Sequence, residues 1–118
     1  MGFTMLEKLF GINVELGLSY CLDDEDIYRE ILEEYVNSEK ISELNEFYAA
    51  KDWKNYQIRI HAVKSTSLTI GAEELSAKAL ALETACKEGR ESDILAKHEE
   101  CMLFYKNVLD TVTNALNY

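Results

Sequence analysis

Apolar side chains recur at steps of three and four residues along most of the chain, and this spacing predicts a series of amphipathic helices. A brief helix is expected over residues 14–20. Asp23 or Asp24 is suited to cap a first main helix that ends near Asn37, because a short acidic side chain accepts hydrogen bonds from the free N–H groups of a first turn. The apolar positions of this helix are Ile27, Ile31, Tyr35 and Val36.

Two further helices are expected before residue 71. Ser38 can cap a short one that ends near Ala50 and has as its apolar positions Ile41, Leu44, Phe47 and Tyr48. Asp52 can cap a longer one, whose steps of three and four define a core seam of Trp53, Tyr56, Ile60, Val63, Ser67 and Ile70.

Two glycines separate the last helices. Gly71 interrupts the apolar spacing, and Gly89 is placed to end the following helix, whose apolar positions are Leu75, Ala79, Leu82 and Cys86. A final helix begins at about Glu91 and should bury a wide face. Two adjacent stripes form this face, one of Leu95, Met102, Leu109 and Leu116 and the other of Ile94, Cys101, Tyr105, Val108 and Val112.

The fold class follows from this pattern together with composition. The 118 residues include no proline and only five glycines, so little in the chain punctuates the many short strands of a β fold. We therefore predict an all-α fold, an antiparallel up-and-down four-helix bundle with a short additional N-terminal helix. The length is that of one domain, which we place at residues 11–118, after an N-terminal extension over residues 1–10 that can hold a short helix.

Charge and cysteine usage narrow the function classes. The formal net charge of -10 repels nucleic acid and anionic membrane surfaces, so neither is an expected partner. No apolar run reaches the roughly 18 residues of a membrane span, and the start of the chain lacks the apolar core of a signal peptide. Three widely spaced cysteines without a C-x-x-C pair favour a reduced, cytoplasmic setting. For the oligomeric state, a monomer is the default expectation.

His61 lies on the helix after Asp52 and points away from its core seam. At about 100° per residue the two directions differ by roughly 130°, so the imidazole should be exposed. Residues 51–70 contain four basic residues and one acidic residue, but Arg59 points away from His61 and is not counted in the site. The neighbours of His61 on its own face are Lys54, Gln57, Ile58, Lys64, Ser65 and Leu68.

These neighbours suit a phosphoryl carrier. A neutral, exposed imidazole beside cationic donors can attack an electrophilic phosphorus and then hold the resulting dianion. Gln57 and Ser65 add polar groups, and Ile58 and Leu68 are apolar side chains without a core position that can contact a partner. A surface histidine near lysines is more often only solvated, so the residue types alone leave both interpretations open.

The other polar features have structural explanations. His98 lies within the apolar face of the last helix, where a core histidine without a function is expected. Neither histidine follows a glutamate by three residues, as the di-metal four-helix bundles require, so no metal or cofactor site is expected. The acidic run at residues 23–26 lacks the ligand spacing of a calcium loop and suits a helix N-terminus.

A family resemblance enters at the stretch from His61 to Ala72, HAVKSTSLTIGA, which resembles the signature of histidine-containing phosphotransfer domains. It extends over most of residues 11–116. The resemblance implies that His61 is the phosphoacceptor, that Lys64 neutralises the phosphoryl group and that Gly71 forms the turn after the active helix. Ser65 stands where most members have glycine, and Asn13 where many have aspartate. Downstream, the pattern continues through Leu75, Ala79, Leu82 and Glu83.

By this resemblance the chain is expected to accept a phosphoryl group on His61 from a receiver-domain phosphoaspartate and to relay it to another receiver aspartate in a two-component phosphorelay. Expected partner contacts are Lys54, Ile58, Leu68 and Gly71. No glycine-rich nucleotide loop is present, so the chain should be a stoichiometric carrier and not an enzyme, with Mg²⁺ supplied by the receiver. Two alternatives stay open: a helical interaction module that is never phosphorylated, and the phosphoacceptor domain of a chemotaxis-type kinase.

Overall fold

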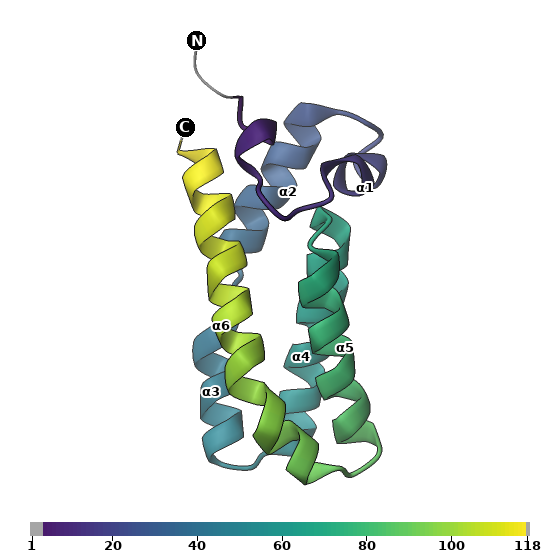
Figure 1. Cartoon of the computed structure of the whole chain (residues 1–118), viewed down its shortest axis with the longest axis vertical. Coiled ribbons are helices and arrows are strands. Elements are labelled where there is room, and N and C mark those ends of the chain that lie inside the picture. Colours follow the sequence, from purple (N-terminus) through teal and green to yellow (C-terminus); the bar gives the residue numbers. More distant parts are fainter. Residues whose placement is uncertain (1–3, 118) are drawn as a thin grey trace.

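Most residues of the computed structural model, which describes residues 4–117, lie in helices (Figure 1). A 3-10 turn, η1, at Leu6–Lys8 precedes the α-helices α1 Val14–Ser19, α2 Glu25–Asn37, α3 Ile41–Ala49, α4 Trp53–Ile70, α5 Glu73–Lys87 and α6 Glu91–Leu116. Between residues 4 and 117 there is no β-strand. The predicted all-α class is confirmed.

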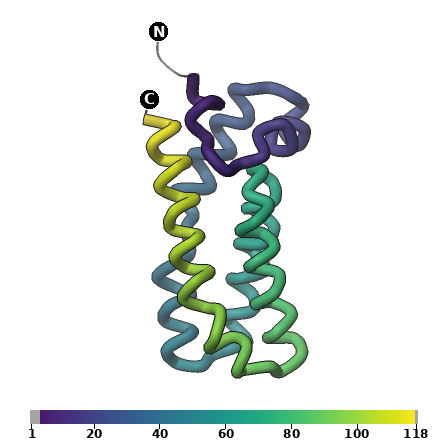
Figure 2. The backbone as a smooth tube through the Cα atoms, in the orientation of Figure 1, coloured from purple at the N-terminus to yellow at the C-terminus, as the bar shows by residue number. Residues whose placement is uncertain are grey.

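The helices form four antiparallel columns along the long axis of the molecule (Figure 1). α2 and α3 follow one another in the first column, since each of them packs against both α4 and α6. The chain then runs along α4, returns along α5 and ends along α6 beside the first column, as the tube in Figure 2 shows. This is the predicted up-and-down bundle, with its first helix divided in two.

The N-terminal segment is part of the packed structure from residue 5 onwards. η1 lies against α6, and Met5 and Leu9 on either side of it are buried in the core. α1 lies across the end of α4. Residues 1–3 of the predicted extension, and Tyr118 at the other end, lie outside the described residues.

The core follows most of the predicted seams. α4 buries Tyr56, Ile60, Val63, Ser67 and Ile70, and its first residue, Trp53, is half-buried. Two of the predicted apolar faces were partly wrong. On α2 the buried residues are Tyr28, Leu32 and Tyr35, whereas Ile27 and Ile31 are exposed. On α6, Leu95 is exposed. The tyrosines lie inside because their hydroxyls have partners there: Tyr28 donates to the Ile70 carbonyl oxygen at 2.7 Å, and Tyr35 pairs with Ser67 at 2.8 Å.

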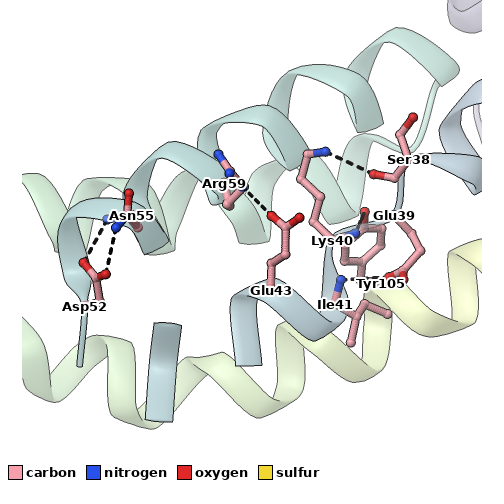
Figure 3. A network of polar contacts seen from close by, with 9 residues as sticks. All are labelled: Ser38, Glu39, Lys40, Ile41, Glu43, Asp52, Asn55, Arg59 and Tyr105. Carbon is pink, nitrogen blue, oxygen red and sulfur yellow. Dashed lines mark hydrogen bonds and ion pairs between the residues drawn. The ribbon is translucent and has the colours of Figure 1, made fainter. Parts of the chain in front are cut away.

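The break between α2 and α3 differs from the prediction that Ser38 caps the second helix. Ser38 ends α2 instead, because its N–H donates to the Glu34 carbonyl oxygen at 2.9 Å and its hydroxyl donates to the Glu34 carboxylate at 2.7 Å. The N–H of Ile41 at the start of α3 donates to the Glu39 carboxylate at 2.8 Å (Figure 3). Glu39, two residues before α3, therefore accepts the hydrogen bond that was expected to go to Ser38.

α4 is fixed at its start and on its α3 side. Asp52 caps it as predicted, accepting from the backbone N–H of Asn55 at 3.2 Å and from the side-chain amide of Asn55 at 2.7 Å. Arg59 forms an ion pair with Glu43 of α3 (Figure 3). Arg59 therefore serves the α3–α4 contact, as expected for a residue outside the site, and the opposite flank of α4 faces α5.

The end of α4 is closed by Gly71 in a left-handed conformation, with φ of 92°. The Gly71 carbonyl oxygen accepts from the N–H of Asn13 at 2.8 Å, which ties the segment before α1 to the α4–α5 turn. A methyl group at Gly71 would lie 2.1 Å from the Asn13 carbonyl oxygen. Glycine is required here both for its conformation and for the close approach of the two backbones.

We expect Gly71→Ala to lower the free energy of unfolding by at least about 2 kcal/mol, because it combines left-handed strain with a backbone clash. Gly89→Ala is the matched control: Gly89 also has a positive φ, of 68°, but nothing lies within 4 Å of an added methyl group. It should cost only the strain, about 1 kcal/mol. Urea denaturation of both variants measures the difference, and equal losses would contradict the close approach at Gly71.

Candidate functional site

His61 lies near the middle of α4, and its side chain is 57% exposed. The core positions Ile60 and Val63 on either side of it are buried, so the backbone beneath the imidazole is fixed by packing. The predicted exposure of His61 is confirmed.

A buried carboxylate from α5 holds one side of the imidazole. Oε2 of Glu83 lies 2.5 Å from Nδ1 of His61, and the Glu83 side chain is only 3% exposed. An ionised carboxylate only accepts hydrogen bonds, so Nδ1 carries the proton and donates. In a neutral ring the other nitrogen, Nε2, then has a free lone pair. The pair therefore sets the tautomer that a nucleophile at Nε2 requires.

Two lysines share the same carboxylate. Lys64 Nζ donates to Oε1 of Glu83 at 2.7 Å, and Lys87 Nζ lies 3.5 Å from Oε2. Burial alone would raise the pKa of Glu83, but the hydrogen bonds from Lys64 and His61 outweigh it and hold that pKa below its ordinary value. Glu83 is thus ionised at neutral pH. Two ammonium groups against one carboxylate leave a net positive charge beside the ring.

The remaining predicted site residues separate into two groups. Lys54, Ile58, Ser65 and Leu68 are exposed, and Gln57 is half-buried, all on the helix that carries His61. Gly71, in contrast, is buried under the backbone of Asn13 and offers little surface to a partner. Its place in the structure is the turn that ends α4.

A surface groove of about 530 Å³ lies between α4 and α5, and its lining begins at Lys64 and Ser65, three and four residues after His61 on α4. Lys64, Ser65 and Leu68 form its α4 side, Leu80 lies on its α5 side, and Tyr20 reaches it from the end of α1. Leu68, Leu80 and Tyr20 are all exposed apolar or aromatic residues. The exposed histidine therefore adjoins a concave, partly apolar surface built from three elements.

Glu83 and Lys87 were not assigned a role from the sequence. Glu83 was noted only as part of the family pattern, although an acidic residue four positions after Ala79 and next to Leu82 falls on the apolar face of its helix. A carboxylate on such a face needs a cationic partner when buried. The need for a cationic partner could therefore have identified Glu83 from the sequence. It would also have indicated Lys87, which lies four residues further along the same helix.

The second histidine has a different environment. His98 is 2% exposed; its Nδ1 lies 2.8 Å from the Tyr56 hydroxyl and its Nε2 lies 2.8 Å from the Asn45 side-chain oxygen. Its ring stacks on Tyr48 with centroids 3.8 Å apart. Burial lowers the pKa of His98 to about 4. The prediction of a core histidine is confirmed.

His98 gives folding stability a pH dependence. Between pH 6.5, its ordinary pKa, and about 4 the unfolded chain binds a proton at this position that the folded chain does not. The contribution of His98 to the free energy of unfolding, about 3 kcal/mol, is therefore fully present above pH 6.5 and is lost as the pH is lowered to about 4. Urea denaturation at a series of pH values should show this loss in the wild type and a flatter dependence in His98→Gln. Parallel curves would contradict the burial of a neutral imidazole.

A comparison with known protein families identifies the same family as the sequence resemblance. A family model described as the Hpt domain matches residues 26–116, which span α2 to α6 and include His61 and Glu83. No curated protein and no solved structure gave a significant match to the chain. Among residues 4–117, no helix is long and apolar enough to cross a membrane. Hpt domains carry phosphoryl groups in two-component signalling and interact with receiver domains. The chain belongs to the Hpt domain family.

Proposed function

We propose that this chain accepts a phosphoryl group on Nε2 of His61 from the phosphoaspartate of one receiver domain and transfers it to an aspartate of a second receiver. The observation that carries the proposal is the exposed imidazole whose Nδ1 is held by the buried carboxylate of Glu83 at 2.5 Å. A histidine that is merely solvated has no need of a buried partner, because desolvating a carboxylate is costly.

The transfer is a displacement at phosphorus. The Nε2 lone pair forms the N–P bond, the bond between phosphorus and the aspartate oxygen breaks, and its electron pair leaves on the receiver carboxylate. The ring becomes positively charged as the bond forms. Glu83 stabilises that charge through Nδ1–H, and the nearby ammonium groups stabilise the transferring oxygens. Reversal of the same steps delivers the phosphoryl group to the second receiver.

The surface around His61 suits a docked protein. Ile58 and Leu68 are exposed apolar residues on the helix that carries His61. Leu80 of α5 is an exposed apolar residue of the groove beside Lys64 and Ser65, which can receive partner side chains. Docking over this surface would exclude water from the reacting atoms and align the phosphoaspartate with Nε2. Lys54, exposed at the start of α4, lies on the same face.

The metal ion, the phosphoryl donor and the phosphoryl acceptor belong to the partner proteins. We assign Mg²⁺ to the receiver, where it neutralises charge on the phosphoryl oxygens. The chain itself is a stoichiometric carrier of one phosphoryl group in the cytoplasm, and its donor and acceptor are proteins. A monomer suffices, because every residue of the proposed site comes from one copy.

The test is incubation of the chain with several phosphorylated receivers and Mg²⁺, without ATP, followed by intact mass analysis before and after mild acid. The proposal predicts a gain of one acid-labile phosphoryl group and its loss to a second receiver. No gain from any receiver would favour an interaction module that is never phosphorylated. A gain only from a nucleotide-binding kinase domain with ATP would favour the phosphoacceptor part of a chemotaxis-type kinase.

A further inference from the structure

Ser76 connects the two helices of the site and has no role in the transfer described so far. Its hydroxyl on α5 donates to the Lys64 carbonyl oxygen on α4 at 2.8 Å, and the residue is buried, with 7% exposure. The same lysine contacts α5 a second time, because its Nζ donates to Oε1 of Glu83 at 2.7 Å. Lys64 is therefore held to α5 through both its backbone and its side chain.

The two residues of α5 that make these contacts lie on one face of that helix. Ser76 and Glu83 are seven residues apart. At about 100° and 1.5 Å per residue, this spacing places them within roughly 20° of each other and about 10 Å apart along the axis. Ala79 lies between them on this face and is buried. A side chain that ends at Cβ offers no ridge to interlock with α4, so the polar contacts on either side of it limit how far α5 can slide.

A small slide of α5 would be enough to separate Glu83 from the imidazole. Oε2 of Glu83 lies 2.5 Å from Nδ1 of His61, and lengthening this contact by about 1 Å would leave no strong hydrogen bond. Displacements of about this size can slow a reaction as much as a hundredfold. The hydrogen bond of Ser76 opposes such a slide, because it ends on the α4 backbone three residues from His61.

We propose that Ser76 is a positioning residue, which holds α5 at the height that places the Glu83 carboxylate against Nδ1 of His61. The proposal rests on the proposed function, because it concerns the reactivity of the same histidine. Ser76 donates to the backbone of α4 and not to the ring, so it acts through Glu83. Loss of the Ser76 hydroxyl should therefore lower the reactivity of His61 only while residue 83 carries a carboxylate.

The first test compares the ring nitrogens of His61 in the unphosphorylated wild type and in Ser76→Ala. At about pH 9, well above the ordinary pKa of an imidazole, ¹⁵N chemical shifts report how the ring proton is shared between Nδ1 and Nε2. Ser76→Ala should move the two signals toward each other, because a less well placed Glu83 selects the Nδ1–H tautomer less strongly.

Ser67→Ala is the matched control. The Ser67 hydroxyl is also buried and also forms a hydrogen bond of 2.8 Å between two helices, but its partner is Tyr35 of α2. The variant therefore loses a comparable contact of α4 without changing the contact between α4 and α5. It should leave both ¹⁵N signals of His61 in place.

The second test measures the rate of phosphorylation by phosphoramidate, a small donor that requires no receiver and so removes docking from the measurement. Ser76→Ala should slow this reaction about threefold to tenfold, the factor that one hydrogen bond is typically worth. In a Glu83→Gln background the same change should alter the rate by less than about twofold, because both residues act through one contact. Ser67→Ala should stay within about twofold of its parent in either background.

Four results would overturn the proposal: unchanged ¹⁵N signals in Ser76→Ala, an equal change in Ser67→Ala, a wild-type rate in Ser76→Ala, or the same slowing with and without the Glu83 carboxylate. The NMR comparison involves no phosphoryl transfer, and the rate measurement involves no receiver. The expected results in both tests, together with no transfer from any receiver, would contradict the proposed function and leave the positioning by Ser76 intact.

Discussion

His61→Gln should abolish phosphoryl transfer to the chain altogether. Glutamine keeps a polar side chain of similar reach but has no nucleophilic nitrogen, so no N–P bond can form. The His61 side chain is largely exposed, and among residues 4–117 its hydrogen-bond partner is Glu83, so the variant should fold as the wild type does. Incubation with a phosphorylated receiver and Mg²⁺, followed by intact mass analysis, should show no acid-labile phosphate.

The other histidine of the chain provides the control. His98→Gln should still gain the phosphoryl group, because a 2% exposed ring with both nitrogens in hydrogen bonds cannot reach a receiver. Circular dichroism checks that both variants are folded. Acid-labile phosphate on His61→Gln, or its loss in His98→Gln with the fold intact, would assign the phosphoacceptor to a residue other than His61.

Glu83→Gln should slow the transfer by roughly 10- to 100-fold without removing it, since partners that orient and polarise a reactive imidazole typically contribute this much or more. The amide no longer carries the negative charge that stabilises the ring as the N–P bond forms. Nor does it select the Nδ1–H tautomer, because an amide can donate as well as accept. Rapid-quench measurement of phosphohistidine formation from a saturating phosphorylated receiver isolates this step from docking.

Glu43→Gln is a matched change on the other side of α4. Its carboxylate lies on α3 and pairs with Arg59, not with the imidazole, so the transfer rate should stay within about twofold of the wild type. Glu83→Asp should fall between the two variants, because the charge is kept but the reach is shortened. A wild-type rate in Glu83→Gln would mean that the short contact with His61 has no part in the reaction.

Residues whose position depends on one helix alone were predictable from the sequence. The seam of α4 and the exposure of His61 depend only on angular spacing along one helix, and the caps at Asp24 and Asp52 depend only on residues within the first turn. Gly71 was placed correctly as a turn for the same reason. Its close approach to Asn13 involves two segments far apart in the chain and could not be read from spacing.

The errors come from contacts between helices. Ile27 and Ile31 are as apolar as Leu32, so their spacing alone does not show which face of α2 turns inward. The face that does so also carries Tyr28 and Tyr35, whose hydroxyls find partners on α4. Leu95 has helical spacing with buried residues of α6 but faces outward. Glu83 was the largest omission, because its role depends on the pairing of α4 with α5, which brings Glu83 against His61 from 22 residues away.

The most direct test of the account is to identify the ring nitrogen that carries the phosphoryl group. Protein labelled with ¹⁵N-histidine is phosphorylated by a receiver, and long-range ¹H–¹⁵N correlations distinguish the two nitrogens of each imidazole. The account predicts phosphate on Nε2 of His61, with Nδ1 still protonated and facing Glu83. Phosphate on Nδ1 of His61, or on His98, would contradict it.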